Sequence, residues 1–382
     1  QSRRQRQMCI RDRNAIGYGI LPTPLMMQSV AMTGVDAINM LAVLLFALPA
    51  GFVASRFSAA LSAFLIVALL GTQVGFGYWR LNIEPDAENE SQVLRLVQPA
   101  IDQSQKWQPE QARQIFDDLL ALSTAPGVDD NVDRPTVIIW PETAVPFILT
   151  REPSAVGAIA EMLQVGQTLI AGAVREEGEE EAEDAGNLYY NSILVIDSEG
   201  IITGAADKVH LVPFGEYLPY AEQLSALGLK AVAAADRGYV GATQRRSLAL
   251  PGGISAIPLI CYEAIFAGEV SPIEATDGLL INVTNDAWYG NTPGPYQHFH
   301  QSRLRTVELG MPMARAANNG VSSIIDAKGR IVKQLGYEQA GAIDAQLPGK
   351  IALPLGKQYS NHVFWLIFLL FATTGLLARL RR

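Results

Sequence analysis

The sequence has few of the residues that build disulfides, metal sites or nucleic-acid interfaces. It contains two cysteines, Cys9 and Cys261, which lie far apart in different kinds of sequence, so we expect no structural disulfide. His298 and His300 share a segment, but no cysteine or carboxylate stands at metal-ligand spacing, so we expect satisfied or exposed histidines and no metal. A phosphate-binding glycine loop is also lacking, and we expect no cofactor. The net charge of −9 argues against a nucleic-acid partner, which needs a basic patch.

Apolar residues are abundant, and they concentrate at the two ends of the chain. Residues 37–54 and 57–79 carry no charge, and a third apolar run, 362–380, is closed by arginines. Each run approaches the roughly 20 residues that a helix needs to cross a bilayer. We predict a membrane-spanning hairpin with Arg56 in a tight turn, followed by a C-terminal spanning helix. Buried helices of a soluble core are the alternative.

The segments before the hairpin are of two kinds. Residues 14–36 are apolar but broken by prolines and glycines, which favours an interfacial or re-entrant piece within a membrane region 14–80. Residues 1–13 are rich in arginine and join abruptly to that piece, without signal-peptide architecture. We expect them to be non-native, with Cys9 carrying no function. A basic cytoplasmic loop is the alternative.

The arginines also predict an orientation. Under the positive-inside rule, Arg56 and the terminal cluster 379–382 should face the cytoplasm. Arg80, just beyond the other end of the run 57–79, does not fit this orientation. The polar part of the chain, 80–360, then lies on the opposite side, which in a bacterium is the periplasm. We therefore expect a multi-pass protein of the inner membrane, with its polar domain in the periplasm.

The central region 81–355 alternates short apolar runs with amphipathic stretches, which predicts an α/β domain with helices covering a sheet core. The expected strands are 92–97, 136–140, 168–173, 192–197, 254–260, 278–283 and 322–325. The expected helices are 109–123, 154–165 and 297–317. The acidic run 176–184 is expected to be a solvated loop.

Cys261 stands at the end of the buried strand 254–260 and is followed by Tyr262 and Glu263. A lone thiol at a strand end beside a carboxylate is a candidate nucleophile. A buried structural cysteine that behaves as a small apolar residue is the alternative.

Two other segments also place an ionisable side chain at the end of a strand. Glu142 follows Trp140 and Pro141, and a carboxylate in such apolar surroundings is a candidate general base, although a capping or surface glutamate fits as well. Lys208 precedes an apolar loop that returns to Glu216. If the loop is buried, the lysine needs that carboxylate and can stabilise an oxyanion. On an exposed loop the two would form a weak ion pair.

A further strand ends at Asn285 and Asp286, ahead of Trp288, Tyr289 and Gly290. We interpret this segment as wall and scaffold of the same pocket.

In this order, Glu142, Lys208 and Cys261 resemble the glutamate–lysine–cysteine triad of the nitrilase, or carbon–nitrogen hydrolase, superfamily. The resemblance covers about residues 90–350. The motifs WPETAVPF, KVHLVPFGEYLP, ICYEAIF, NDAWYG and RAANNG, with membrane helices on both sides, resemble more narrowly the bacterial apolipoprotein N-acyltransferase family. That family has more membrane helices than the three predicted here, so we expect an N-terminally truncated chain.

The resemblance implies an αββα sandwich inserted between transmembrane helices, and it implies residue roles. Glu142 would be the general base, Lys208 the oxyanion stabiliser and Cys261 the nucleophile. Glu216 and Glu263 would support them. The family also has residues that match Trp107, at the pocket mouth, and Tyr262, next to the nucleophile.

The implied reaction passes through a thioester in two steps. Cys261 takes an acyl chain from a phospholipid and passes it to the α-amine of a diacylated apolipoprotein, in the last step of lipoprotein maturation. We expect a monomer whose partners are these two substrates and the bilayer. A membrane-anchored amidase or nitrilase and a non-catalytic lipoprotein-binding module are the alternatives.

Overall fold

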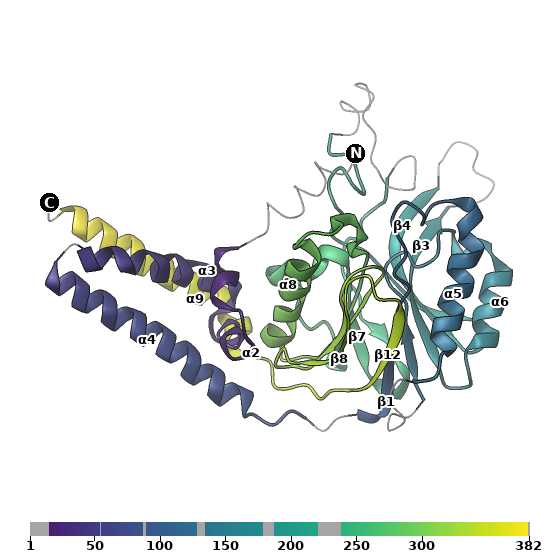
Figure 1. Ribbon diagram of the computed structural model, residues 1–382, viewed down its shortest axis with the longest axis horizontal. Coiled ribbons are helices and arrows are strands. Elements are labelled where there is room, and N and C mark those ends of the chain that lie inside the picture. Colours follow the sequence, from purple (N-terminus) through teal and green to yellow (C-terminus); the bar gives the residue numbers. More distant parts are fainter. Residues whose placement is uncertain are drawn as a thin grey trace.

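The computed structural model describes residues 15–53, 55–86, 89–127, 134–178, 187–220 and 238–380, with the side chains of 89–91, 355, 377 and 378 left out. The predicted segment 1–13 with Cys9, most of the acidic run 176–184, and Arg381 and Arg382 lie outside these residues. An α/β domain and a group of long helices make up the described part (Figure 1).

Two six-stranded sheets form the α/β domain, in the orders β12-β1-β2-β3-β4-β5 and β11-β10-β9-β8-β7-β6. The first sheet contains β1 (Asn89–Gln98), β2 (Val137–Ile139), β3 (Thr168–Glu177), β4 (Leu188–Asp197), β5 (Ile202–Asp207) and β12 (Gly341–Leu347). The second contains β6 (Leu248–Ala249), β7 (Ser255–Ile260), β8 (Asp277–Thr284), β9 (Met313–Ala317), β10 (Ser322–Ile325) and β11 (Ile331–Leu335).

Alternating side chains explain why the sheets stack. Successive residues of a strand point to opposite faces, so an apolar strand can serve two cores. In β2, Val137 and Ile139 face the core between the sheets, while Ile138 faces the outer helices. In β7, Ile260 joins the same central core and Leu259 the outer one.

The outer faces are covered by helices. The first sheet is covered by α5 (Ala112–Thr124) and α6 (Pro153–Met162), and the second by α8 (Gly294–Leu309) (Figure 1). The order helix, sheet, sheet, helix confirms the predicted αββα sandwich.

One predicted element was wrong. The expected helix 297–317 is two elements, because α8 ends at Leu309 and β9 begins at Met313. Gly310 caps the helix in the left-handed conformation, with φ 64°, and Pro312 cannot continue it. Five strands were not predicted, namely β5, β6, β9, β11 and β12.

Within the part of the chain that the structure describes, three helices are long and apolar enough to cross a membrane, spanning Val30–Val53, Arg56–Leu81 and Gly356–Leu376. They correspond to α3 (Val30–Ala47) with the 3-10 turn η2 (Leu48–Val53), to α4 (Arg56–Leu81), and to α9 (Leu355–Leu380). The predicted tight turn around Arg56 is wrong, because η2 lies between the helices and Arg56 is the first residue of α4.

The helices also pair differently from a simple hairpin. α3 packs along α9, and small residues let the two backbones approach (Figure 1). A Cβ on Gly356 would lie 2.3 Å from the Ala31 carbonyl oxygen. The segment before α3, with η1 (Ile16–Ile20) and α2 (Pro24–Met27), packs its apolar side chains against Leu304 and Val307 of α8. It therefore lies between the long helices and the α/β domain.

Polar contacts tie the helices to the domain at this junction. Lys328 Nζ donates to the carbonyl oxygens of Leu81, at 2.9 Å, and of Ile83, just beyond the end of α4. Arg80 donates to the Val307 carbonyl of α8 at 3.0 Å. At the other membrane helix, Lys357 Nζ donates to the Ala267 carbonyl at 2.5 Å. Both chain connections to the membrane helices are thus fastened to the domain.

Candidate active site

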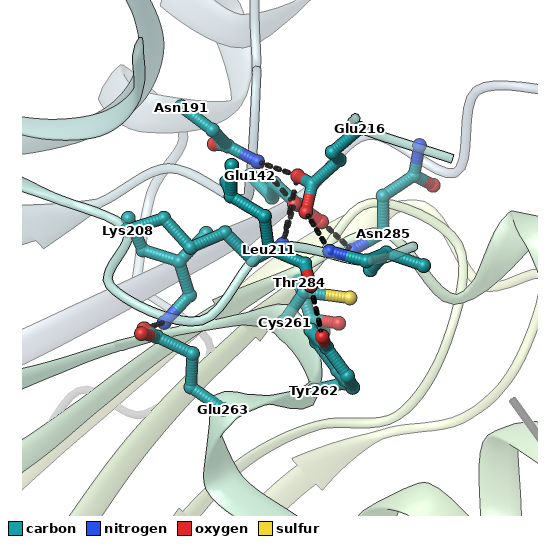
Figure 2. A network of polar contacts seen from close by, with 12 residues as sticks. Glu142, Asn191, Lys208, Leu211, Glu216, Cys261, Tyr262, Glu263, Thr284 and Asn285 are labelled. Carbon is teal, nitrogen blue, oxygen red and sulfur yellow. Dashed lines mark hydrogen bonds and ion pairs between the residues drawn. The ribbon is translucent and has the colours of Figure 1, made fainter. Parts of the chain in front are cut away.

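Four strands deliver the candidate residues to one edge of the sandwich. β2 and β5 run in the same direction in the first sheet, as β7 and β8 do in the second. Glu142, Lys208, Cys261 and Asn285 follow the carboxyl ends of these strands. Figure 2 shows the side chains of Glu142, Lys208 and Cys261 gathered at this edge, where Asn285 contributes its backbone N–H.

Cys261 occupies a sharp turn between β7 and the 3-10 turn η6 (Cys261–Ile265). Its φ of 54° is uncommon for a residue with a side chain, and such strain is concentrated at functional sites. Burial and the nearby Glu142 raise the pKa of its thiol well above the ordinary value, while Lys208 and a hydrogen bond with Thr284 act in the opposite direction. The resting sulfur is therefore a thiol that needs a base.

Glu142 supplies a carboxylate next to that thiol. Its Oε1 accepts from Asn191 at 2.8 Å and from Lys208 at 3.5 Å, and its Oε2 accepts from the backbone N–H of Asn285 at 3.0 Å. The close approach of β3 requires Gly172, since a Cβ there would lie 2.2 Å from the Pro141 carbonyl oxygen. The carboxylate is held in one orientation by three donors from three different elements.

Lys208 is buried between two carboxylates. Its Nζ lies 2.9 Å from Glu216 and 3.5 Å from Glu142, and its side chain is 1% exposed. Burial disfavours the charged form, but Glu216 and Glu142 outweigh it and raise the pKa of Lys208 well above its ordinary value. The loop is therefore buried, and Lys208 remains a cation over the whole physiological range.

Glu216, the second carboxylate beside Lys208, is also held by hydrogen bonds. One of its oxygens accepts from Asn191 at 2.7 Å, and the other accepts from the Val212 N–H at 2.8 Å. Asn191 thus bridges Glu142 and Glu216 with a single side-chain amide. It was not predicted, although a polar residue within the apolar strand 188–197 was an available signal, because asparagine is depleted in strands.

Glu263 joins the nucleophile turn to the lysine loop. It accepts from the N–H of Ile260 at 2.7 Å, from those of Val209 and His210 at 3.0 and 3.1 Å, and from Arg245 at 2.9 Å. This buried carboxylate therefore helps to fix the relative position of Lys208 and Cys261.

Tyr262 and Trp107 have different surroundings. The Tyr262 hydroxyl donates to the Leu211 carbonyl at 2.5 Å, and its ring centroid lies 5.3 Å from Lys208 Nζ. Trp107, in the loop that follows β1, is 42% exposed. The structure therefore brings Tyr262 to the buried charges and leaves Trp107 at the surface.

The segment 284–286 borders Glu142, to which the Asn285 N–H donates, and is held by buried polar contacts. Thr284 donates to Asp286 at 3.1 Å, and Asp286 pairs with Arg315 and His298, both at 2.8 Å. Burial opposes ionisation of Asp286, but Arg315 and His298 hold its pKa below the ordinary value. His298 is thus a buried histidine bonded to Asp286 at Nδ1, whereas its Nε2 is buried without a hydrogen-bond partner among the described residues. Within the described residues, no group of three or more histidine, cysteine or acidic side chains could hold a metal ion.

The sequence of the chain matches known proteins. Residues 94–352 match the family model of the carbon-nitrogen hydrolases. Over 365 residues the chain is 49% identical to the apolipoprotein N-acyltransferase of Sinorhizobium fredii, covering 94% of this chain and 67% of that protein. Over 377 residues it is 46% identical to the enzyme of the same name from Brucella melitensis, covering 97% and 69%. The chain spans about two thirds of the length of these relatives.

Among solved structures, an amidase from Nesterenkonia sp. is similar with 17% identity and a TM-score of 0.46. The alignment covers 74% of this chain and 98% of the amidase.

Proposed function

The chain belongs to the carbon–nitrogen hydrolase family and, within it, to the apolipoprotein N-acyltransferases, which makes it a membrane-associated acyltransferase, and from this premise we propose its substrates and mechanism. The acyl donor is a phospholipid. The acceptor is the α-amine of the N-terminal S-diacylglyceryl cysteine of an apolipoprotein. The reaction completes the maturation of the lipoprotein.

One observation carries this proposal. A buried thiol, a carboxylate and an ammonium converge at Cys261, Glu142 and Lys208, in a domain fastened to membrane-spanning helices. A thiol with a raised pKa needs a base beside it, and the carboxylate of Glu142 is the group in place.

In the first half-reaction, Glu142 removes the thiol proton as Cys261 attacks the ester carbonyl of the phospholipid. Lys208, helped by the backbone N–H of Tyr262, stabilises the oxyanion of the tetrahedral intermediate. An ammonium has three donors, and Glu216 and Glu142 accept from Lys208, so one donor remains for the oxyanion. When the intermediate collapses, the proton on Glu142 passes to the departing lysophospholipid oxygen, and the acyl chain stays on Cys261 as a thioester.

In the second half-reaction, the neutral α-amine of the acceptor attacks the thioester. Glu142 takes a proton from the nitrogen and returns it to the sulfur as the amide forms, which regenerates the thiol. The enzyme is unchanged and the product carries three acyl chains. The two substrates therefore use one site in turn, which is a ping-pong mechanism.

The membrane context supports the choice of substrates, because both are lipids. The spanning helices hold the domain at the bilayer, and the arginines at positions 56 and 379 favour the periplasmic side of the inner membrane. A monomer suffices for the mechanism, since all the named residues come from one chain.

A direct assay tests the function. Protein purified in mixed micelles with phospholipid is incubated with a synthetic diacylated lipopeptide, and the products are identified by mass spectrometry. We expect a mass increase of one fatty acyl chain on the peptide amine. Release of free fatty acid without acylated peptide would instead indicate a hydrolase that passes the acyl group to water. Binding of the lipopeptide without either product would indicate a non-catalytic module.

A further inference from the structure

A second buried lysine stands at the proposed catalytic centre. Lys106 is 1% exposed, and its Nζ donates to the backbone carbonyl of Glu142 at 3.2 Å. It lies in the loop after β1, directly before the exposed Trp107. Burying an ammonium costs several kcal/mol unless other charges compensate for it. Its position therefore has to be explained by the charges around it.

The charges of the neighbouring side chains account for the buried position of Lys106. Glu142 and Glu216 lie around Lys208, which can neutralise only one of them, whereas Glu263 has its own partner in Arg245. Without another cation, the group around Cys261 carries one excess negative charge. With Lys106 there are two carboxylates and two ammonium groups, and the site is neutral while Cys261 is a thiol.

We propose that Lys106 is a positioning residue of the acyl-transfer reaction, which fixes the main chain of Glu142 and balances the negative charge that moves between Glu142 and Cys261. During proton transfer this charge leaves the carboxylate and appears on the sulfur. A cation close to both groups stabilises the charge at either place, so the transfer does not create an uncompensated charge in a buried site. Lys106 itself exchanges no proton or covalent bond with the substrate. The inference rests on the proposed function.

The expected protonation of Lys106 agrees with its position beside Glu142. Burial lowers the pKa of Lys106 to about 8, and the two groups that face it, Glu142 after β2 and Cys261 after β7, act in the opposite direction. The ammonium form therefore predominates at neutral pH and is lost as the pH rises through about 8. A role that needs its charge then produces a loss of activity on the alkaline side.

The test measures formation of the acyl-enzyme in a single turnover, with phospholipid and no acceptor, by intact-protein mass as a function of pH. In the wild type, the rate should decline as the pH rises through about 8 and level off near the rate of Lys106→Met. Lys106→Met should slow acylation by about 10-fold to 100-fold at pH 7 and abolish this alkaline decline. Lys106→Arg, which keeps the charge at all these pH values, should recover much of the rate without the decline.

The control is Lys333→Met, on the edge strand β11, which should keep both the rate and the pH profile of the wild type. An unchanged pH profile in Lys106→Met with a merely lower melting temperature would overturn the proposal in favour of a structural role. If neither Lys106 variant folds, a wild-type rate that does not decline above about pH 8 overturns it as well.

A substrate-free measurement separates this inference from the proposed function. Alkylation of Cys261 by iodoacetamide at fixed pH should be slower in Lys106→Met, because loss of the cation destabilises the thiolate. If the wild type forms no acyl-enzyme from phospholipid but this difference persists, the proposed function fails and the charge-balancing role stands. Equal alkylation rates in wild type and variant would overturn the charge-balancing role itself.

Discussion

Cys261 combines a strained backbone with a side chain that resists ionisation. The φ is 54°, and burial together with the charge of Glu142 works against a free thiolate. Replacement by serine changes the nucleophile by one atom and leaves the packing nearly unchanged. Because an alkoxide is much harder to form than a thiolate, we expect Cys261→Ser to lower acyl transfer by more than about 10³-fold.

This expectation is checked by intact mass after incubation with phospholipid alone. The wild type should gain one fatty acyl group, and Cys261→Ser, with an unaltered circular dichroism spectrum, should gain none. An adduct of equal yield on the serine variant would remove Cys261 from the mechanism.

Glu142 has two opposite effects on the same sulfur, and these effects can be separated. Its charge adds to burial in raising the pKa of Cys261, yet it is the proposed acceptor of the thiol proton. Glu142→Gln should therefore lower the thiol pKa, although burial keeps it above the ordinary value, and should speed alkylation by iodoacetamide in alkaline solution. Acyl-enzyme formation should nevertheless fall by at least about 10²-fold, since an amide accepts no proton.

The two readouts are measured on the same preparation. Faster alkylation combined with lost acylation supports the assignment of the base. Acylation at the wild-type rate would move the base elsewhere, with Glu263 as the next carboxylate to test.

At the residue scale, the candidate side chains that occur in recognisable motifs could be predicted from the sequence. Side chains that reach the site only through the fold could not. Glu142, Lys208, Glu216 and Cys261 could be picked out because each ends a strand or a buried loop. Lys106 could not be, since nothing in its neighbourhood in the chain shows that it is 1% exposed and bonded to the Glu142 carbonyl. That contact joins residues far apart in the sequence.

At the scale of elements, the chain order of β2, β5, β7 and β8 determines which side chains meet. Strand content was predictable where apolar runs were continuous, as in β7 and β8. It was missed in β9, because the sequence around Arg315 is alanine-rich and continues a helical pattern. The break depends on Gly310, whose left-handed conformation ends α8 before Pro312.

Gly310 offers a test of this turn. A Cβ there would lie 2.7 Å from the Ile351 carbonyl oxygen, and the φ of 64° is unfavourable for any other residue. Gly310→Ala should therefore reduce the free energy of unfolding by about 2–4 kcal/mol, from the sum of backbone strain and overpacking.

The matched control is Gly157→Ala in α6. No atom lies within 4 Å of a Cβ built there, and the position is helical, so this variant should be stabilised by about 0.5–1 kcal/mol. Denaturant unfolding of both variants in detergent gives the comparison. Equal stability of the two would show that the turn at Gly310 tolerates a side chain.

At the scale of the whole molecule, the orientation in the membrane decides whether the substrates reach the site. We expect Ser55, at the start of α4, to lie in the cytoplasm and the β4–β5 turn at Glu199 to lie in the periplasm; both positions are exposed. In a background of Cys9→Ala and Cys261→Ala, a membrane-impermeant thiol reagent added to spheroplasts should label Glu199→Cys and spare Ser55→Cys. Permeabilised spheroplasts serve as the control, in which both positions should react.

The reverse labelling would place the catalytic residues in the cytoplasm and contradict acylation of exported lipoproteins. Equal labelling of both sites in intact spheroplasts would mean that the segment between Ser55 and Glu199 does not cross the bilayer.

The contacts at the junction have a mechanical consequence. Lys328 holds the end of α4, Arg80 reaches α8, and Lys357 fastens the start of α9, so the domain is attached at both points where the chain enters and leaves it. A domain anchored at two points cannot tilt about either of them as a hinge. On the proposed function, we expect the thiol of Cys261 to keep a constant level relative to the membrane helices, at which the donor ester and the acceptor amine must each meet it.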